Sequence, residues 1–262
     1  MTVTKVWIHG ITGRVGQKLF QSLAQNKQFK FYGGSARIFT GGLHDNDEVT
    51  PETLAENLEK TEVIFDFSSS EGNEVLLDAL SKEKMSSKKI IIGTTQLPEK
   101  QLMKWEKVAK ENKHSILLAP NTSIGVLILS EIAQTVGPLF QKFGFDCEIV
   151  ETHHKKKKDA PSGTALKLAE RINKDLKKKL VLQTHHDGLR NPDTLGIHSV
   201  RAGDVFGEHV VRFISANEEI ALEHKALNRD LFAEGAITLA KWLCDQKPGF
   251  FTLEDVKLDG LL

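Results

Sequence analysis

The first half of the chain alternates short apolar runs with segments whose apolar residues recur at helical spacing. Helical spacing follows the first, third and fourth of these runs, for example at Val15, Leu19 and Leu23. Continuous apolar strands separated by helices are typical of a parallel sheet covered by helices on its faces. The pattern predicts an α/β domain whose strands occupy residues 5–9, 29–32, 63–67, 90–92 and 116–118.

Beyond about Ser123 the pattern changes. Residues 145–153 alternate apolar and polar side chains, which favours a strand with one covered face. Further strand-like runs follow without a long helix between them, at residues 199–202, 208–215 and 220–224, before helical spacing returns at 231–243. We therefore predict a second α+β domain with a mixed or antiparallel sheet. The expected division is residues 1–123 with 232–262 in the first domain and 124–231 in the second.

Composition excludes several classes of protein. The 262 residues include 35 Lys plus Arg and 35 Asp plus Glu, and this neutral balance argues against a nucleic-acid-binding protein. Two cysteines are too few for a disulfide scaffold or a four-cysteine metal site. The longest aliphatic runs, at 90–92 and 126–129, are too short to span a bilayer. With no signal sequence before the first strand, we expect a reduced, cytoplasmic protein without membrane contact.

A glycine-rich turn joins the first predicted strand to the first helix. Its pattern is GxxGxxG at residues 10–16, with Thr12 where a second glycine is usual. Glycines also end strands for conformational reasons alone, so the pattern by itself is weak. At the first strand–helix turn, however, it favours a Rossmann-type dinucleotide site with pyrophosphate at the helix N-terminus. The predicted cofactor contacts are Gly10, Ile11, Thr12, Gly13, Arg14 and Val15.

The segment about 20 residues farther on bears on which dinucleotide binds. NAD-specific folds place a carboxylate there, on the adenosine ribose. Residues 33–37 contain no acid and end in Arg37, whose guanidinium suits a 2′-phosphate. The alternative is that Arg37 is an ordinary solvated loop cation. We predict that NADPH is preferred, with NADH as the second candidate cofactor.

Two further turns follow parallel strands. Ligands of such sheets bind at the carboxyl ends of the strands, so both turns are candidates to face the nicotinamide. The alternative is that each is an ordinary strand-ending turn. The residues concerned are Gly93, Thr94 and Thr95, and then Ala119, Pro120, Asn121 and Thr122.

Residues 151–165 hold the densest set of chemically active side chains. His153, His154 and Lys157 follow a predicted strand, and Ser162 is a predicted helix N-cap. The amides of the next residues, Gly163 and Thr164, are then positioned to bind an anion. Histidines, a lysine and an anion-binding helix end together indicate a site for a carboxylated substrate that needs a proton.

Other interpretations of this segment remain open. The two histidines suggest a metal site, but adjacent strand residues point to opposite faces and the neighbouring lysines repel a cation. We therefore predict no metal. The lysine run at 155–158 is weak support for nucleic-acid binding in a neutral chain, and most of these lysines are expected to be solvated.

The whole chain resembles the 4-hydroxy-tetrahydrodipicolinate reductase (dihydrodipicolinate reductase) family. Residues 151–165 carry its signature, and the likeness continues through the glycine turn and residues 65–68, 93–95, 119–121, 199–204, 207–209 and 224–226. The resemblance implies NAD(P)H-dependent reduction of 4-hydroxy-tetrahydrodipicolinate to tetrahydrodipicolinate, with loss of water, in lysine and diaminopimelate biosynthesis. It implies a small dicarboxylate substrate and a homotetramer assembled through the second domain.

The resemblance also implies roles for individual residues. His153 matches the family's proposed proton donor and Lys157 its second catalytic residue, and the sequence leaves open which of the two delivers the proton. His154, Gly163 and Thr164 match positions that hold the substrate, to which we add Ser162. Arg37 matches a position facing the adenosine ribose, and Ala36 stands where several members carry an acid. The first domain is then the NAD(P)-binding domain and the second binds substrate, with closure about hinges near Ser123 and Leu231. The alternatives are another two-domain NAD(P)-dependent oxidoreductase, a non-catalytic NADP(H)-binding sensor, or a nucleic-acid module with a basic loop.

Overall fold

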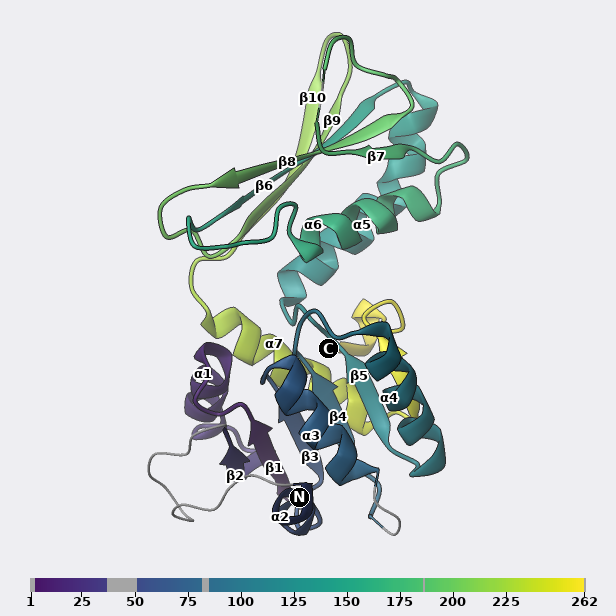
Figure 1. Ribbon diagram of the computed structural model, residues 1–262. Coiled ribbons are helices and arrows are strands. Elements are labelled where there is room, and N and C mark those ends of the chain that lie inside the picture. The colour runs from purple at the N-terminus through teal and green to yellow at the C-terminus, as the bar shows by residue number, and fades with distance from the viewer. Residues whose placement is uncertain (1–2, 37–50, 82–84, 186, 262) are drawn as a thin grey trace. The chain divides into compact units, whose positions relative to one another are not determined.

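The computed structural model describes residues 3–36, 51–81, 85–185 and 187–261 (Figure 1). Arg37 therefore lies outside the described residues. Contacts divide the chain into two compact units, Met1–Ser123 with Arg229–Leu262, and Ile124–Asn228. The chain thus returns to the first unit at Arg229, three residues before the predicted start of the returning segment at residue 232.

The first unit is built on a six-stranded sheet in which every pairing is parallel, in the order β11-β5-β4-β3-β1-β2. Its strands β3, β4 and β5 are buried along nearly their whole length, as their apolar runs predict. The predicted Rossmann-type sheet is confirmed. The strands are β1 (Thr4–His9), β2 (Phe29–Ser35), β3 (Val63–Asp66), β4 (Lys89–Ile92), β5 (Ser115–Leu118) and β11 (Gly249–Thr252).

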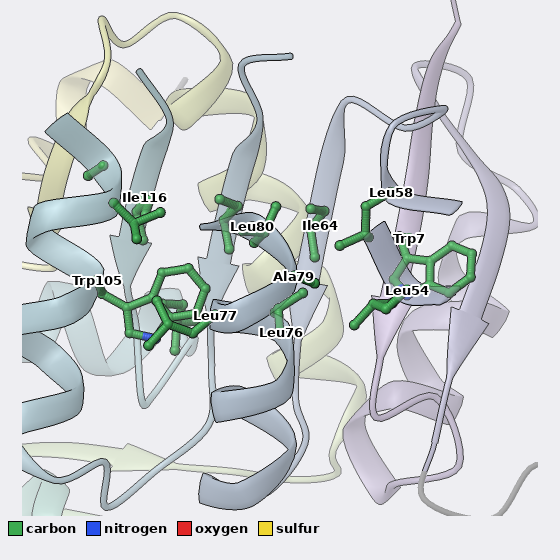
Figure 2. Packing of buried hydrophobic residues seen from close by; sticks show 14 residues of the cluster. Trp7, Leu54, Leu58, Ile64, Leu76, Leu77, Ala79, Leu80, Trp105 and Ile116 are labelled. Atoms are coloured by element: carbon green, nitrogen blue, oxygen red, sulfur yellow. The ribbon is translucent and has the colours of Figure 1, made fainter. Parts of the chain in front are cut away.

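Helices cover both faces of this sheet. On one face α1 (Arg14–Leu23) packs against α7 (Asp230–Cys244), and on the other lie α2 (Pro51–Leu58), α3 (Ser70–Leu80) and α4 (Glu99–Glu111) (Figure 1). A short 3-10 helix, η1 (Leu258–Leu261), lies at the end of the described chain. Figure 2 shows the core between the second face and its helices, where the ring of Trp105 is fully buried near Leu77. The Trp105 Nε1–H donates to Asn73 Oδ1 at 2.8 Å, so its polar atom is satisfied inside this core.

The second unit contains a mixed five-stranded sheet in the order β10-β9-β6-β8-β7. Strands β6, β8 and β7 are parallel, whereas β9 runs antiparallel to both of its neighbours. Along β6 buried and half-buried residues alternate, and the buried set packs against α5 and α6. The elements are α5 (Ile124–Lys142), β6 (Asp146–His153), α6 (Gly163–Lys174), β7 (Val181–Gln183), β8 (Thr194–Arg201), β9 (Glu208–Ile214) and β10 (Glu219–Lys225).

One expectation about this unit was wrong. Strand β8 begins at Thr194, five residues before the predicted start, because residues 194–197 are buried in the sheet. The aliphatic run at 126–129 belongs to α5, a 19-residue helix that is long and apolar enough to cross a membrane by length and composition. Leu129 and Ala133 of α5 belong to the same buried core as Ile172 of α6, and 28% of the apolar stretch of α5 is buried in this unit.

Candidate active site

The glycine turn packs closely against the loop after β3. Gly10 has a φ of +85°, and a Cβ there would lie 2.4 Å from the carbonyl oxygen of Phe67. A Cβ on Gly16 would lie 2.3 Å from the carbonyl oxygen of Gly10. These glycines are therefore required by the close approach of backbone segments.

Hydrogen bonds divide the turn into two parts. The amides of Gly10 and Ile11 both donate to the Ser35 carbonyl oxygen, at 2.7 and 3.2 Å, and the Gly13 amide donates to Gly10 O. These residues shape the turn with amides that are already engaged. Helix α1 has Gly13 at its N-cap, which offers no side chain to cap it, so the amides of its first turn, beginning at Arg14, are the ones suited to bind a phosphate.

The start of α3 shows what a self-capped helix looks like in the same unit. Ser69 accepts a hydrogen bond from the Gly72 amide at 3.2 Å, and Glu71 adds a negative charge in the first turn. At α1 the corresponding charge is positive. Burial, followed by the charge of Arg14, lowers the pKa of Arg229. A helix start without a side-chain cap and with Arg14 in its first turn fits the pyrophosphate of a dinucleotide.

A buried carboxylate fixes the second predicted turn. Asp66, fully buried at the end of β3, accepts hydrogen bonds from Thr94 Oγ1 at 2.8 Å and Asn73 Nδ2 at 2.6 Å. Its other oxygen accepts from the amide and hydroxyl of Ser68. The predicted contact Thr94 is thus engaged inside the unit, and its turn is held rigidly at the carboxyl end of β4.

The third predicted turn, after β5, is tied to α7. Thr122 Oγ1 donates to the carbonyl oxygen of Phe232 at 2.7 Å, and Asn121 Oδ1 accepts from the Ser123 amide at 3.0 Å. The turn therefore packs on the segment by which the chain returns to the first unit.

In the second unit, Glu151 on β6 organises the His-His-Lys segment. Its carboxylate is fully buried and receives both terminal nitrogens of Arg201 on β8, at 2.6 and 2.8 Å. The Ser162 amide donates to Oε1 at 3.1 Å, and His153 Nδ1 lies 2.5 Å from Oε2. Burial opposes ionisation of this carboxyl, but hydrogen bonds from His153, Arg201, Ser199 and the Ser162 amide outweigh it and hold the pKa of Glu151 well below its ordinary value.

This carboxylate brings His153 and the beginning of α6 together. Ser162 caps α6 as predicted, accepting a hydrogen bond from the Ala165 amide at 3.2 Å. Next to His153, with ring centroids 5.3 Å apart, lies His209 of β9. Burial, followed by the neighbouring His153, lowers the pKa of His209 to about 3, so His209 is uncharged at neutral pH.

The lysine run is mostly solvated. Lys155, Lys156 and Lys158 are exposed, whereas Lys157 is partly buried and pairs with Asp159 at 2.9 Å. Burial opposes ionisation of Asp159, but hydrogen bonds from Lys157 and from backbone groups, Gly163 among them, lower its pKa. Asp159 thus engages two groups of the predicted site, the ammonium of Lys157, predicted as the second catalytic residue, and the amide of Gly163, predicted to hold substrate. Elsewhere, His154 and Thr164 are partly buried, and Gly163 is exposed with open space where a side chain would project.

Sequence reasoning missed Glu151, Arg201 and His209 as members of this site. Arg201 lies 50 residues from Glu151 in the chain and reaches it through the parallel pairing of β6 with β8. The sequence signal that could have found this cluster is Glu151, an acid at an inward-facing position of an alternating strand. A carboxylate buried there requires a buried partner. Within the part of the chain that the structure describes, no group of three His, Cys, Asp or Glu side chains could hold a metal ion.

Comparison with known proteins agrees with this architecture. Family models described as dihydrodipicolinate reductase, N-terminus and C-terminus, match residues 4–122 and 125–256. The chain belongs to the dihydrodipicolinate reductase family. The 4-hydroxy-tetrahydrodipicolinate reductase of Aquifex aeolicus is 36% identical over 264 residues, covering 96% of this chain and 98% of the relative. The enzyme of the same name from Nitratiruptor sp. is 38% identical, covering 95% and 97%.

A solved structure shares the fold. The dipicolinate-bound dihydrodipicolinate reductase from Paenisporosarcina sp. TG-14 has a TM-score of 0.76 at 23% identity, covering 97% of this chain and all of that one. The resemblance seen in the sequence is therefore confirmed, together with the prediction of an NAD(P)H-dependent reductase of lysine and diaminopimelate biosynthesis.

Proposed function

We propose that this chain reduces 4-hydroxy-tetrahydrodipicolinate with NADPH, and that His153 supplies the proton that completes the reaction. The observation that carries this proposal is the shared carboxylate of Glu151, which bonds both His153 Nδ1 and the Ser162 amide. A substrate carboxylate bound at the start of α6 is then beside the imidazole. Names of relatives, including the dipicolinate-bound one, support a small dicarboxylate as substrate.

Substrate binding is assigned to His154, Ser162, Gly163 and Thr164, with Lys157. Asp159 now pairs with Lys157 and with the Gly163 backbone, so we infer that a substrate carboxylate replaces it there. Each charge-assisted hydrogen bond to a carboxylate contributes about 1.5–3 kcal/mol. Two such contacts fix a small ring in one orientation, and orientation is what a hydride acceptor requires.

When bound, the reduced nicotinamide supplies the hydride. The reduced ring of the substrate then carries an electron-rich carbon that must receive a proton, and a positioned acid accelerates such a step by about 10²–10⁴. His153 is buried and held, whereas Lys157 is partly exposed and paired with Asp159. We assign proton delivery to His153 and binding of a substrate carboxylate to Lys157.

Cofactor preference follows from charge around the adenosine end. Residues 33–36 contain no acid, and Arg37 follows them. These features support NADPH over NADH, with Arg37 as the predicted partner of the 2′-phosphate. Replacing Arg37 by Ala is expected to lower the NADPH-to-NADH ratio of kcat/KM, and an unchanged ratio would contradict this assignment.

The remaining assignments rest on the family. We infer that the first unit, residues 1–123 with 229–262, binds the cofactor, that the second unit, residues 124–228, binds substrate, and that the second units assemble a homotetramer in the cytoplasm. Substrate and cofactor must meet for hydride transfer, so closure about hinges near Ser123 and Leu231 belongs to the proposal.

A coupled assay tests the proposed reaction. The unstable substrate is generated in place by the preceding synthase, and loss of NADPH absorbance is followed with and without this chain. Substrate-dependent oxidation of NADPH is expected. Binding of NADPH without turnover would indicate the sensor alternative, and turnover only with a different imine would indicate another oxidoreductase.

A further inference from the structure

We propose that Glu151 and Arg201 are positioning residues that fix the tautomer and orientation of His153. The inference rests on the proposed function, because it concerns the histidine assigned there as proton donor. It adds two residues, one on each of two paired strands, that act on the reaction through His153.

The tautomer follows from hydrogen-bond chemistry. An ionised carboxylate only accepts hydrogen bonds, so the 2.5 Å contact between Glu151 Oε2 and His153 Nδ1 requires the proton to be on Nδ1. Nε2 is then the nitrogen that exchanges a proton. It faces Gly207, where a Cβ would lie only 3.1 Å from it, so the absence of a side chain at this position keeps Nε2 uncrowded.

Arg201 keeps Glu151 in place. Its two terminal nitrogens bind both carboxylate oxygens, and this planar two-point contact prevents the carboxylate from turning away from His153. Nη2 also donates to the carbonyl oxygen of Asp159 at 2.6 Å. One guanidinium therefore orients the carboxylate and anchors the loop that carries Lys157.

The surroundings contain few other groups that could take over this role. The titratable and charged side chains around His153 and His209 are Glu151 on β6, Arg201 on β8, His224 on β10, and Lys157 and Asp159 in the loop before α6. Among these described groups the two carboxylates are Glu151 and Asp159, and Asp159 is engaged with Lys157 and Gly163. The orientation of His153 therefore depends on Glu151.

The same strand supplies a matched control. Glu148 accepts from Arg190 Nε at 2.9 Å and lies 2.9 Å from His198 Nε2, so it repeats the combination of one acid, one arginine and one histidine. It does so on the face of β6 opposite to Glu151 and His153. We call Glu151, His153 and Arg201 the inner triplet, and Glu148, His198 and Arg190 the outer triplet.

The experiment measures kcat and KM from pH 6 to pH 10 for the wild type and for Glu151→Gln, Arg201→Lys, Glu148→Gln, His153→Gln and the double variant Glu151→Gln/His153→Gln. Glu151→Gln is expected to lower kcat by roughly 10²-fold with KM changed little, because a neutral amide permits the wrong tautomer. The alkaline limb of its kcat profile should move to lower pH, since Arg201 remains without its carboxylate. Glu148→Gln should leave kcat within about twofold of the wild type, as expected of a position away from the reacting groups.

The double variant separates positioning from simple folding damage. If Glu151 acts through His153, its replacement causes no further loss of kcat once His153 is Gln. Additive losses, or equal losses in Glu148→Gln and Glu151→Gln, would overturn the proposal. Should Glu151→Gln fail to fold, Arg201→Lys decides, because it retains the charge and loses the two-point contact: an unchanged pH profile would count against positioning. Absence of turnover in the wild type would instead reject the proposed function.

Discussion

The two faces of β6 carry the same three kinds of side chain in two different environments. In the inner triplet the Glu151 side chain is fully buried and that of His153 is 11% exposed. In the outer triplet the Glu148 side chain is 14% exposed and that of His198 is 43% exposed. Both acids sit within 3 Å of an arginine nitrogen and a histidine nitrogen, so the contacts alone do not distinguish the two triplets.

Burial, more than contact geometry, therefore decides how strongly each triplet affects catalysis and stability. A buried charge must be fully paired, and removing one partner leaves the other uncompensated. In the outer triplet the arginine and the histidine are 26% and 43% exposed, so water can replace a lost partner there more readily. A fixed proton position is therefore expected only on the inner face.

The largest contrast is expected in catalysis. His153→Gln removes the proposed proton donor and should lower kcat by about 10²–10⁴, whereas His198→Gln should leave kcat nearly unchanged. Single-turnover measurements with NADPH separate the chemical step from product release. A comparable loss in both variants would mean that the outer face also serves the reaction, for example by holding an assembly.

The next contrast concerns stability. Arg201→Gln leaves the fully buried Glu151 carboxylate without its main partner and should lower the free energy of unfolding by about 3–5 kcal/mol. Arg190→Gln exposes Glu148 to water and should cost less than about 1 kcal/mol. Urea unfolding followed by circular dichroism gives both values, and similar costs would show that the two faces are equally protected from solvent.

The fold was largely predictable from the sequence because its central strands are continuous apolar runs. Strands β3, β4 and β5 stand out in this way, and the alternation in β6 identified a sheet with one covered face. Strand β7 escaped prediction because it is a three-residue edge strand with exposed side chains, and β11 because it is only four residues long and partly exposed. Helix α2 was missed because its apolar signal is limited to Leu54, Ala55 and Leu58.

The candidate site was predictable where its residues are close in sequence. His153, Lys157 and Ser162 fall within ten residues, so one motif identified them. Arg201 was not predicted, because its contact depends on the register that places Ser199 opposite Glu151 across β6 and β8. Register between strands separated by some forty residues follows from tertiary packing and leaves no local signature.

The buried inner face should also make the unfolding free energy depend on pH in the acid range. The buried His209 has a pKa of about 3, below the ordinary 6.5, so the unfolded chain binds a proton that the folded chain does not. Its contribution therefore destabilises the fold as pH falls from about 6.5 towards 3, by about 1.4 kcal/mol per pH unit. Unfolding free energies between pH 7 and pH 4 should decline less steeply in His209→Gln than in the wild type, and an unchanged slope would contradict a buried, uncharged His209.

The smallest change in unfolding free energy is expected for a substitution in the outer triplet. Its dependence on salt concentration distinguishes it from a substitution in the inner triplet. Glu148→Gln is expected to cost about 0.5–1 kcal/mol of unfolding free energy in 0.1 M salt, as exposed ion pairs do. At 1 M salt the screening length falls from about 10 to 3 Å, so this cost should shrink to a fraction of its value. The cost of Glu151→Gln should persist, because no counterion reaches a fully buried carboxylate and what is lost there is its hydrogen bonds to Arg201 and His153. A salt-sensitive Glu151→Gln would mean that solvent enters the inner face, and the fixed tautomer of His153 would then lose its physical basis.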